Sequence, residues 1–406
     1  MSRVLCLVLD SLGIGALPDA ADYGDAGADT LGHIAAWCAR PLAQGGRGRV
    51  LDLPQLRLAG LGHAYALVHG EPPAGWQAEH VPQWHWGAAR EQSRGKDTVS
   101  GHWEMMGLPV PWDWGYFSAP VESFPAELIA ALAAAAGTTG VLGRCHASGT
   151  AIIEQLGAAH EESGWPIVYT SADSVLQIAA HEQHFGRERL YALCAQARGL
   201  VDHWRIGRVI ARPFLGDRVH GYARTTGRRD YAVPPSAPTL LDRLCADGGQ
   251  VIAIGKIHDI FAGRGISRSI SAYGIDGLLD ASLAALRTAP ARTLVYTNLV
   301  DFDQEYGHRR DVAGYAQALE GFDARLPELI AALGPEDVLV LTADHGNDPS
   351  WHGSDHTREH VPLLLHSPAR GGETLGVRDS FADLAQTLAG TFGLPPLTHG
   401  LAFAWS

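Results

Sequence analysis

The sequence predicts a doubly wound α/β fold with a mostly parallel sheet and one inserted α+β domain. Apolar, partly β-branched runs end at acidic residues, and helical patterns alternate with these runs through the last third of the chain. Nearly continuous apolar character is typical of strands buried on both faces, as in a parallel sheet. With 406 residues the chain is long enough for two domains.

Five apolar runs are expected to form strands of the main sheet, and they cover residues 4–10, 250–255, 293–303, 338–345 and 361–366. Three of them end at aspartates, namely Asp10, Asp301 with Asp303, and Asp344. Ligands gather at the carboxyl ends of the strands in such sheets. We therefore expect these carboxylates to share one crevice, although they are hundreds of residues apart in the sequence.

Helices are expected to alternate with these strands. From Asp311 to Leu333 apolar residues recur at spacings of three and four, which predicts one amphipathic helix that is restarted or kinked at Pro327. Shorter helices are expected at 277–289 and 380–392. The region from Pro41 to Trp86 is rich in Gly, Pro and Trp, and it is expected to form long loops over the core.

An inserted domain is predicted between an exit loop at Trp112 and a proline-rich linker at Pro234. Residues 113–235 are assigned to this domain, and residues 1–112 and 236–406 are assigned to the core. Helices are expected at 125–136 and 187–200, and short strands at 167–170 and 208–211.

The net charge of −13 argues against a nucleic-acid partner and against anionic membranes. The five cysteines are scattered and form no C-x-x-C pair, which indicates free thiols in a reducing compartment. The apolar run Val4–Leu9 is too short for a signal peptide or a membrane span. We expect a cytoplasmic, monomeric protein that acts on small molecules.

Three carboxylates and three imidazoles follow the strands and form a candidate metal-binding set: Asp10, Asp303, His308, Asp344, His345 and His356. Six such ligands are enough for two divalent ions about 3.5–4 Å apart. Oxygen and nitrogen ligands without thiolate favour Mn²⁺, Zn²⁺ or Fe²⁺ over Ca²⁺ and Mg²⁺. Asp301 and Asp355 are assigned supporting or structural roles. The segment from His181 to His184 does not match H-E-x-x-H, so a metalloprotease is not supported.

Thr98 is the candidate nucleophile. It lies near the start of a predicted helix, with Lys96 beside it, and such a position suits a phosphoryl group. A hydroxyl needs activation by a metal or a base to act as a nucleophile. Ser93 and Ser100 are rival hydroxyls, and a simple helix-capping role for Thr98 is the alternative.

Seven sequence segments resemble the bacterial phosphopentomutase family of the alkaline phosphatase superfamily. They are residues 10–15 (DSLGIG), 28–33 (ADTLGH), 95–104 (GKDTVSGHWE), 170–175 (TSADSV), 300–310 (VDFDQEYGHRR), 342–346 (TADHG) and 355–360 (DHTREH). The resemblance runs in order from the first strand to the C-terminal region.

The resemblance implies an alkaline phosphatase-like core with an inserted cap domain, and a Mn²⁺-dependent mutase. Such an enzyme interconverts ribose 1-phosphate and ribose 5-phosphate, and the 2-deoxyribose pair. By motif match, Thr98 is the phosphorylated nucleophile and the six residues above are the metal ligands. Arg212 and Lys256 match positions that hold the distal phosphate, and Asp173 matches a contact to a sugar hydroxyl. A sugar bisphosphate such as glucose 1,6-bisphosphate is expected to prime the enzyme.

Seven arginines between residues 205 and 229 form a candidate phosphate clamp, although most of them are expected to be solvated. A phosphatase, a sulfatase or a cofactor-independent phosphoglycerate mutase would share the metal ligands. Thr98 within Gly-Lys-Asp-Thr argues against these alternatives. A non-catalytic sensor of metals or sugar phosphates has no support in the sequence.

Overall fold

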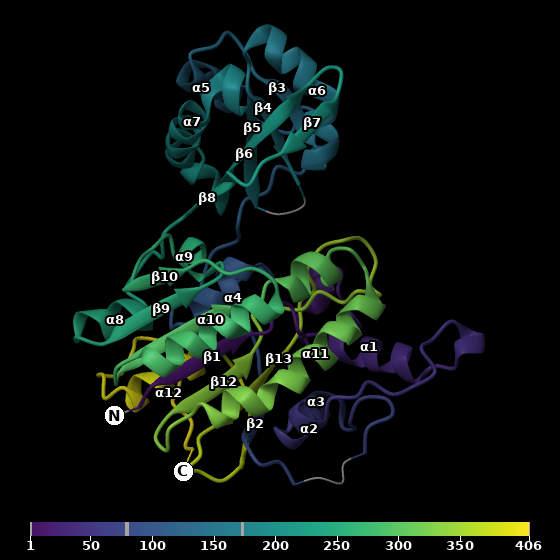
Figure 1. Ribbon diagram of the computed structural model, residues 1–406, viewed down its shortest axis with the longest axis vertical. Coiled ribbons are helices and arrows are strands. Elements are labelled where there is room, and N and C mark those ends of the chain that lie inside the picture. The colour runs from purple at the N-terminus through teal and green to yellow at the C-terminus, as the bar shows by residue number, and fades with distance from the viewer. Residues whose placement is uncertain (1, 78–80, 172–173, 406) are drawn as a thin grey trace. The chain divides into compact units, whose positions relative to one another are not determined.

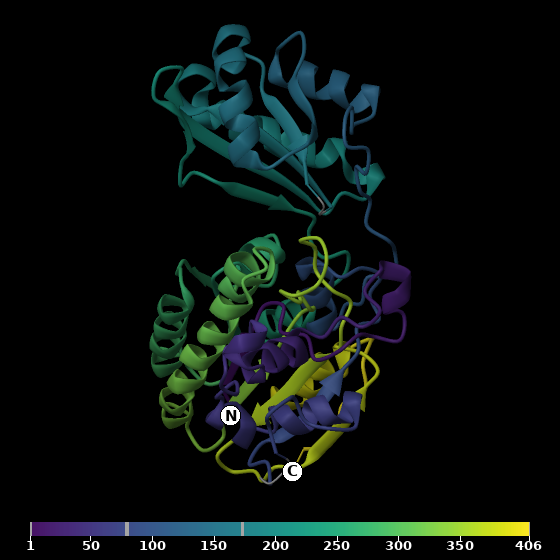
Figure 2. The same cartoon turned by 90° about the vertical axis from the view of Figure 1, so that its right-hand side faces the viewer.

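The computed structural model describes residues 2–77, 81–171 and 174–405. The chain forms two compact units (Figures 1 and 2). The first unit contains Met1–Trp112 and Pro235–Ser406, and the second contains Asp113–Pro234. Among the helices that the structure describes, none has the length and the apolar character that a membrane crossing requires.

An eight-stranded sheet runs through the first unit in the order β10-β9-β11-β1-β12-β13-β2-β14. Its strands are β1 (Val4–Val8), β2 (His85–Ala89), β9 (Gln250–Ile254), β10 (Arg268–Ile270), β11 (Thr293–Asn298), β12 (Val338–Thr342), β13 (Val361–His366) and β14 (Thr374–Arg378). Neighbouring strands pair in parallel, except that β13 is antiparallel to both β12 and β2. The predicted mostly parallel sheet is therefore confirmed, together with all five expected strands.

The strand β1 lies in the middle of this sheet. Val4 pairs with Leu294 of β11 on one side and with Val338 of β12 on the other. All five residues of β1 are buried. The uninterrupted apolar run of this strand follows from its burial on both faces.

The helices of the first unit pack in two groups, one on each face of the sheet (Figures 1 and 2). One group contains α1 (Thr30–Ala39), α2 (Pro54–Leu58), α3 (Leu61–His69), α10 (Ile275–Thr288) and α11 (Val312–Ala331). The other contains α4 (Thr98–Met105), α8 (Leu240–Ala246), α9 (Ile257–Ile260) and α12 (Ala382–Thr391). The turns η1 (Ala20–Tyr23), η2 (Leu42–Gln44) and η5 (Phe302–Gly307) complete the unit.

Two expectations about helices were wrong. The region 41–86 contains α2, α3 and the start of β2 instead of only long loops. Pro54 occupies the first turn of α2, where its missing N–H costs nothing, and the left-handed Gly60 and Gly70 delimit α3. Of the two alternatives expected at Pro327, the restart is wrong, because α11 continues through this residue. A kink there stays a prediction. The buried Leu326 supports the helix at this point by packing.

The second unit is built on a six-stranded mixed sheet in the order β3-β4-β5-β6-β7, with β8 paired to β6. Its strands are β3 (Leu142–His146), β4 (Ile167–Thr170), β5 (Val175–His181), β6 (Arg208–Asp217), β7 (Gly221–Arg224) and β8 (Arg229–Ala232). Its helices are α5 (Ala126–Ala136), α6 (Gly149–Ser163) and α7 (Arg187–Leu200), with the turns η3 (Glu182–Gly186) and η4 (Asp202–Trp204).

Two apolar clusters cover the sheet of the second unit. One joins α5 and α7 to the sheet and includes Leu132 and Leu190. The other joins α6 to the sheet and includes Ile152, Ile153 and Tyr169. The expected helices and strands of this segment are present, and β6 is longer than expected because it continues to Asp217.

Candidate metal centre and nucleophile

Three aspartates follow the three central strands of the first unit. Asp10 follows β1, Asp303 follows β11, and Asp344 follows β12. These strands are adjacent and parallel, so their carboxyl ends lie at one edge of the sheet. All three aspartates are buried, and Asp10 and Asp344 are only 1% and 0% exposed.

The six candidate ligands form two groups. Asp10, Asp344 and His345 form one group, and Asp303, His308 and His356 form the other. Within each group one ligand atom per residue lies within 4.8 Å of the others. The rings of His345 and His356 stack with their centroids 3.9 Å apart, so the two groups are neighbours.

Distances within the groups suit ligands that surround one ion. His345 Nε2 lies 3.3 Å from Asp344 Oδ2 and 3.5 Å from Asp10 Oδ1. His308 Nε2 lies 3.1 Å from Asp303 Oδ2. Atoms that each bind a metal at about 2.0–2.2 Å are separated by similar distances.

The three imidazoles are oriented by the backbone. His308, His345 and His356 donate their Nδ1–H to the carbonyl oxygens of Ser354 (2.6 Å), Gly346 (3.1 Å) and Lys96 (2.8 Å), respectively. A carbonyl oxygen only accepts, so the proton of each ring is on Nδ1 and the lone pair is on Nε2. This is the tautomer in which Nε2 binds a metal while Nδ1–H holds the ring in place.

Two carboxylate oxygens in one group need a cation. Asp10 Oδ1 and Asp344 Oδ2 are buried and accept no hydrogen bond from the part of the chain that the structure describes. Burial raises the pKa of Asp10, and the nearby charges of Asp344 and Asp303 raise it further. Burial lowers the pKa of His345 to about 4, so this imidazole is neutral at neutral pH. A bound divalent ion would favour the ionised form of these aspartates, and the neutral imidazole is the form that binds a metal.

The hydroxyl of Thr98 lies beside these groups. Thr98 is the first residue of α4, and its Oγ1 is 3.2 Å from His345 Nε2. Asp97 caps the helix by accepting the N–H groups of Val99 and Ser100. The start of α4 therefore brings a hydroxyl and the positive end of a helix to the metal ligands.

The two rival hydroxyls have other partners. Ser93 Oγ donates to Glu104 Oε2 at 2.6 Å, and Ser100 Oγ donates to Asp97 Oδ2 at 2.9 Å. Both serines are fully buried. Of the three hydroxyls, the one that faces a candidate ligand is therefore that of Thr98.

The nucleophile helix approaches the end of β12 closely. A Cβ atom on Gly101 would lie 2.1 Å from the carbonyl oxygen of Asp344, so only glycine fits there. One residue later, His102 Nδ1 donates to the Thr98 carbonyl at 2.8 Å and lies 3.2 Å from Asp344 Oδ2. Gly101 and His102 together fix Thr98 relative to Asp344.

Comparisons with known proteins identify the family of the chain. A model of the metalloenzyme superfamily matches residues 2–396. The chain is 56% identical to the phosphopentomutase of Tolumonas auensis over 400 residues, and 57% identical to that of Methylobacterium nodulans over 400 residues. Each alignment covers 98% of both chains. The chain belongs to the phosphopentomutase family. It is therefore an enzyme, and the superfamily and the two residue groups support its use of divalent metal.

Among solved structures, the phosphoglycerate mutase of Leishmania mexicana matches this phosphopentomutase family member with a TM-score of 0.48 and 12% identity. The match covers 99% of this chain and 98% of that chain.

The residues that the phosphopentomutase resemblance assigns to the substrate lie in different parts of the chain. Lys256 lies at the start of α9 in the first unit, close enough for its charge to lower the pKa of Asp10. Arg212 lies in β6 of the second unit, where its Nε donates to Gln177 Oε1 at 3.1 Å. Burial lowers the pKa of Arg212 to about 10. Asp173 lies outside the described residues.

Two supporting residues were missed in the sequence. Asn298 donates to Asp10 Oδ2 at 2.8 Å, and Asn347 donates to Asp303 Oδ1 at 2.7 Å. They are the only two asparagines of the chain. This rarity is the sequence feature that could have marked them as candidates for the site. Each of them holds a carboxylate of a different group.

The ammonium of Lys96 is engaged by two carboxylates. Its Nζ lies 2.9 Å from Asp25 Oδ2 and 3.2 Å from Asp355 Oδ2. The charge of Lys96 is therefore balanced within the protein, and the structure ties this residue to the segment that carries His356. This role differs from the direct contact with a phosphoryl group that its position beside Thr98 suggests.

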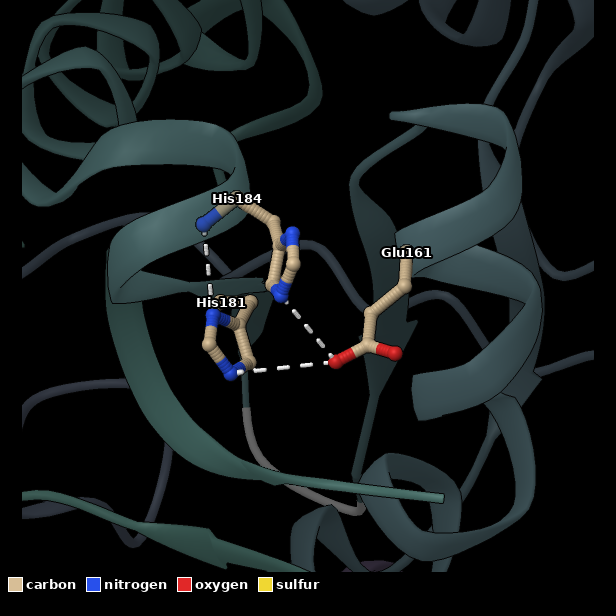
Figure 3. A group of neighbouring side chains, drawn as sticks. All are labelled: Glu161, His181 and His184. Atoms are coloured by element: carbon tan, nitrogen blue, oxygen red, sulfur yellow. Dashed lines mark hydrogen bonds and ion pairs between the residues drawn. The ribbon is translucent and has the colours of Figure 1, made fainter.

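A third group of possible ligands occurs in the second unit (Figure 3) and consists of Glu161, His181 and His184. The Nδ1 of His181 accepts the backbone N–H groups of Gln183 and His184, at 3.2 and 3.3 Å. The proton of His181 is therefore on Nε2, which donates to the carbonyl oxygen of Gly216 at 3.0 Å. This is the reverse of the tautomer in the two groups of the first unit, and it does not suit metal binding through Nε2.

Proposed function

We propose that the protein interconverts ribose 1-phosphate and ribose 5-phosphate, and the 2-deoxyribose pair, through a phosphate carried on Thr98. The observation that carries this proposal is the position of Thr98 Oγ1 at the start of α4, 3.2 Å from His345 Nε2. Family membership supports the substrate, because the relatives are phosphopentomutases. The core and cap roles of the two units are part of the same proposal.

The two residue groups would each hold one divalent metal ion. We assign Asp10, Asp344 and His345 to one ion and Asp303, His308 and His356 to the other. Oxygen and nitrogen donors without thiolate suit Mn²⁺, Zn²⁺ or Fe²⁺. Among these we choose Mn²⁺, because the resemblance to phosphopentomutases implies it. Bound ions would neutralise the phosphoryl oxygens and lower the pKa of the Thr98 hydroxyl.

In the proposed reaction the phosphoryl group is transferred twice, first from Thr98 to the sugar and then from the sugar back to Thr98. Phospho-Thr98 gives its phosphoryl group to the free hydroxyl of the sugar monophosphate, which leaves a sugar 1,5-bisphosphate and the Thr98 hydroxyl. Thr98 Oγ1 then attacks the phosphorus of the other phosphate, the bond from phosphorus to the sugar oxygen breaks, and that oxygen takes up a proton. A bisphosphate such as glucose 1,6-bisphosphate would load Thr98 at the start.

The chain's own groups support these steps. The positive end of the α4 dipole favours negative charge on the transferred phosphoryl group, although the N–H groups of Val99 and Ser100 are themselves bonded to Asp97. We propose Lys256 of the first unit and Arg212 of the second as phosphate contacts, because ammonium and guanidinium groups bind phosphate oxygens strongly. Asp173 is proposed to contact a sugar hydroxyl.

A product assay tests this proposal. The purified protein is incubated with Mn²⁺, a trace of glucose 1,6-bisphosphate and ribose 1-phosphate, and ribose 5-phosphate and free phosphate are followed together. Formation of ribose 5-phosphate without free phosphate is expected. Release of free phosphate alone would identify a phosphohydrolase of the same superfamily and would reject the mutase.

A further inference from the structure

A buried carboxylate lies on the helix that begins with the proposed nucleophile. Glu104 is near the end of α4, whereas Thr98 is its first residue. The side chain of Glu104 is 0% exposed. Burial of a carboxylate is costly unless hydrogen-bond donors replace the water around it. The partners of Glu104 therefore show which parts of the chain this carboxylate holds.

Three backbone N–H groups and two hydroxyls of the described residues surround the carboxylate of Glu104. Its Oε2 accepts the N–H and the hydroxyl of Ser93, each at 2.6 Å. Its Oε1 accepts the hydroxyl of Ser380 at 2.7 Å and the N–H of Phe381 at 3.0 Å. The N–H of Gln92 bonds to both oxygens, at 2.9 and 3.0 Å. Both oxygens therefore act as acceptors, as in the ionised form of the side chain.

These bonds close the part of the chain that carries Thr98 into a loop. Residues 92–104, which we call the nucleophile segment, begin with N–H groups that bond to Glu104 and end with Glu104 itself. The hydroxyl of Ser93 also accepts the N–H of Val110 at 2.9 Å. The start of the segment and the end of α4 are therefore tied together, and Thr98 lies between them.

The carbonyl oxygens of the same segment bond to the region of the second ligand group. The carbonyl oxygen of Lys96 accepts the Nδ1–H of the candidate ligand His356 at 2.8 Å. The carbonyl oxygen of Ser93 accepts a hydrogen bond from Arg358 at 2.9 Å. The N–H groups at the start of the segment are thus held by Glu104, and its carbonyl oxygens by residues near the metal centre.

We propose that Glu104 is a positioning residue whose carboxylate holds the nucleophile segment so that Thr98 Oγ1 stays 3.2 Å from His345 Nε2. This role rests on the proposed function, because it acts through the nucleophile assigned there. The anchoring of the segment itself does not depend on the reaction. A misplacement of about 1 Å can lower a rate by about a hundredfold, so a carboxylate at the far end of α4 can control the rate.

Glu104→Gln tests the two acceptors without a change in the size of the side chain. Each oxygen of Glu104 accepts a backbone N–H, from Ser93 on one side and from Phe381 on the other. An amide offers one acceptor oxygen and one NH₂ group. In either orientation the NH₂ group would face an N–H group, so the start of the segment or the start of α12 would move away from α4.

Asp323→Asn is the matched control. Asp323 is a buried carboxylate of the same unit, 2% exposed, and its two oxygens accept the N–H groups of Gln55 and Leu56 in α2. The substitution replaces one acceptor in the same way, at a place that carries no residue of the proposed site. Both variants are expected to lose stability, whereas only Glu104→Gln should misplace Thr98.

Steady-state kinetics of the full-length chain separate the two variants. Rates are measured at saturating Mn²⁺ and at a temperature at which circular dichroism shows each variant to be folded. Glu104→Gln is expected to lower kcat by about a hundredfold and to change the KM for ribose 1-phosphate by less than about threefold, because Lys256 and Arg212 lie outside the segment. Phosphorylation of Thr98 by glucose 1,6-bisphosphate, followed by mass spectrometry, should slow in parallel. Asp323→Asn should match the wild-type protein in all three quantities.

Ser93→Ala covers the case in which Glu104→Gln does not fold. It removes one hydroxyl and leaves the carboxylate and its backbone donors in place, so it disturbs the structure less. The expected loss of kcat is about three- to tenfold, again with little change in KM. A wild-type kcat in every folded variant at these two positions, or an equal loss of kcat in Asp323→Asn, would overturn the positioning role.

Amide hydrogen exchange distinguishes failure of this role from failure of the proposed function. Exchange within residues 92–104 is expected to be faster in Glu104→Gln, whereas in Asp323→Asn the faster exchange should occur in α2. If the wild-type protein forms no ribose 5-phosphate, faster exchange in the segment would support the anchoring and reject the reaction. In an active enzyme, unchanged exchange together with unchanged kcat would overturn the role and leave the reaction.

Discussion

Asn347 donates a hydrogen bond from its side-chain amide to Asp303 Oδ1 over 2.7 Å. Asn298 has the same relationship to Asp10 in the other ligand group. Loss of such a supporting hydrogen bond commonly costs about 10–100-fold in metal affinity or activity. We therefore expect Asn298→Ala and Asn347→Ala each to weaken Mn²⁺ binding by about this factor, as measured by metal titration.

Gln304→Ala is the matched control for the two asparagine variants. Gln304 follows Asp303 directly, but among the described residues its exposed amide bonds only to Glu305. The control should bind Mn²⁺ like the wild-type protein. Wild-type affinity in both asparagine variants would contradict a supporting role for these amides.

Removal of the Thr98 hydroxyl should abolish phosphoryl transfer and leave metal binding intact. Thr98→Ala is expected to lower the mutase rate by more than about a thousandfold, because no other side chain replaces the nucleophile. Mn²⁺ should still raise the melting temperature of this variant, since the six proposed ligands remain. Thr98→Ser keeps a hydroxyl and serves as the control with residual activity. A wild-type mutase rate in Thr98→Ala would refute the assigned role.

A methyl group at Gly101 should displace the nucleophile helix. The added Cβ would meet the Asp344 carbonyl oxygen at 2.1 Å, and a backbone atom cannot move aside as a flexible side chain can. Gly101→Ala is expected to lower kcat strongly and to destabilise the protein by about 1–3 kcal/mol. Activity and urea denaturation measure the two effects.

Gly321→Ala provides the opposite case. Gly321 also lies inside a helix, α11, but a Cβ there has nothing within 4 Å. This variant should be fully active and more stable by about 0.5–1 kcal/mol, because alanine favours helix more than glycine does. Equal losses of activity in both variants would show that close approach to Asp344 is not the cause.

Arg358 should stabilise the loop before Thr98 through a buried ion pair. Its Nη1 donates to Glu91 Oε2 at 2.8 Å and to the carbonyl oxygens of Ser93 and Gly95. Removal of one partner of a buried pair costs about 3–5 kcal/mol. Arg358→Met is therefore expected to lower the free energy of unfolding by about this amount, as measured with urea.

The effect of Arg358→Met should depend on pH. Burial raises the pKa of Glu91 above its ordinary value of 4.5, and Arg358 opposes this rise. Without Arg358 the folded state keeps the Glu91 proton to higher pH, while the unfolded state loses it near pH 4.5. Stability falls with rising pH wherever the folded state binds more protons, so the loss should be larger at pH 8 than at pH 5.

Arg309→Met is the control for the pH experiment. Arg309 pairs with Glu305 on the surface, and its side chain is 65% exposed. Removal of such a pair should cost no more than about 1 kcal/mol at either pH. A loss for Arg358→Met that is the same at pH 5 and pH 8 would contradict the role given to Glu91.

The sequence predicted the central sheet and the residues at its edge. The runs before Asp10, Asp303 and Asp344 were recognisable because strands buried on both faces are apolar throughout. A buried strand that is followed by an aspartate predicts both a central strand of the sheet and a candidate metal ligand from one short segment. The roles of these aspartates and of Thr98 stay predictions until the variants are measured.

The parts that the sequence did not predict depend on tertiary contacts. The helices α2 and α3 are short, and glycines and prolines flank them, so local patterns do not distinguish this region from loops. His102 and Asn298 act through side chains that are distant in the sequence, and no spacing rule pairs Asn298 with Asp10. The cytoplasmic location and the monomeric state also stay predictions.

The central position of β1 has a consequence for how the chain folds during synthesis. β1 leaves the ribosome before its two neighbours in the sheet, β11 and β12, which start only at Thr293 and Val338. The contiguous unit Asp113–Pro234 is complete long before that point and can fold on its own nascent segment. The strand β1 therefore remains unpaired while most of the chain is translated. Pairing over such a separation is slow, so β1 is expected to stay unpaired until late in synthesis.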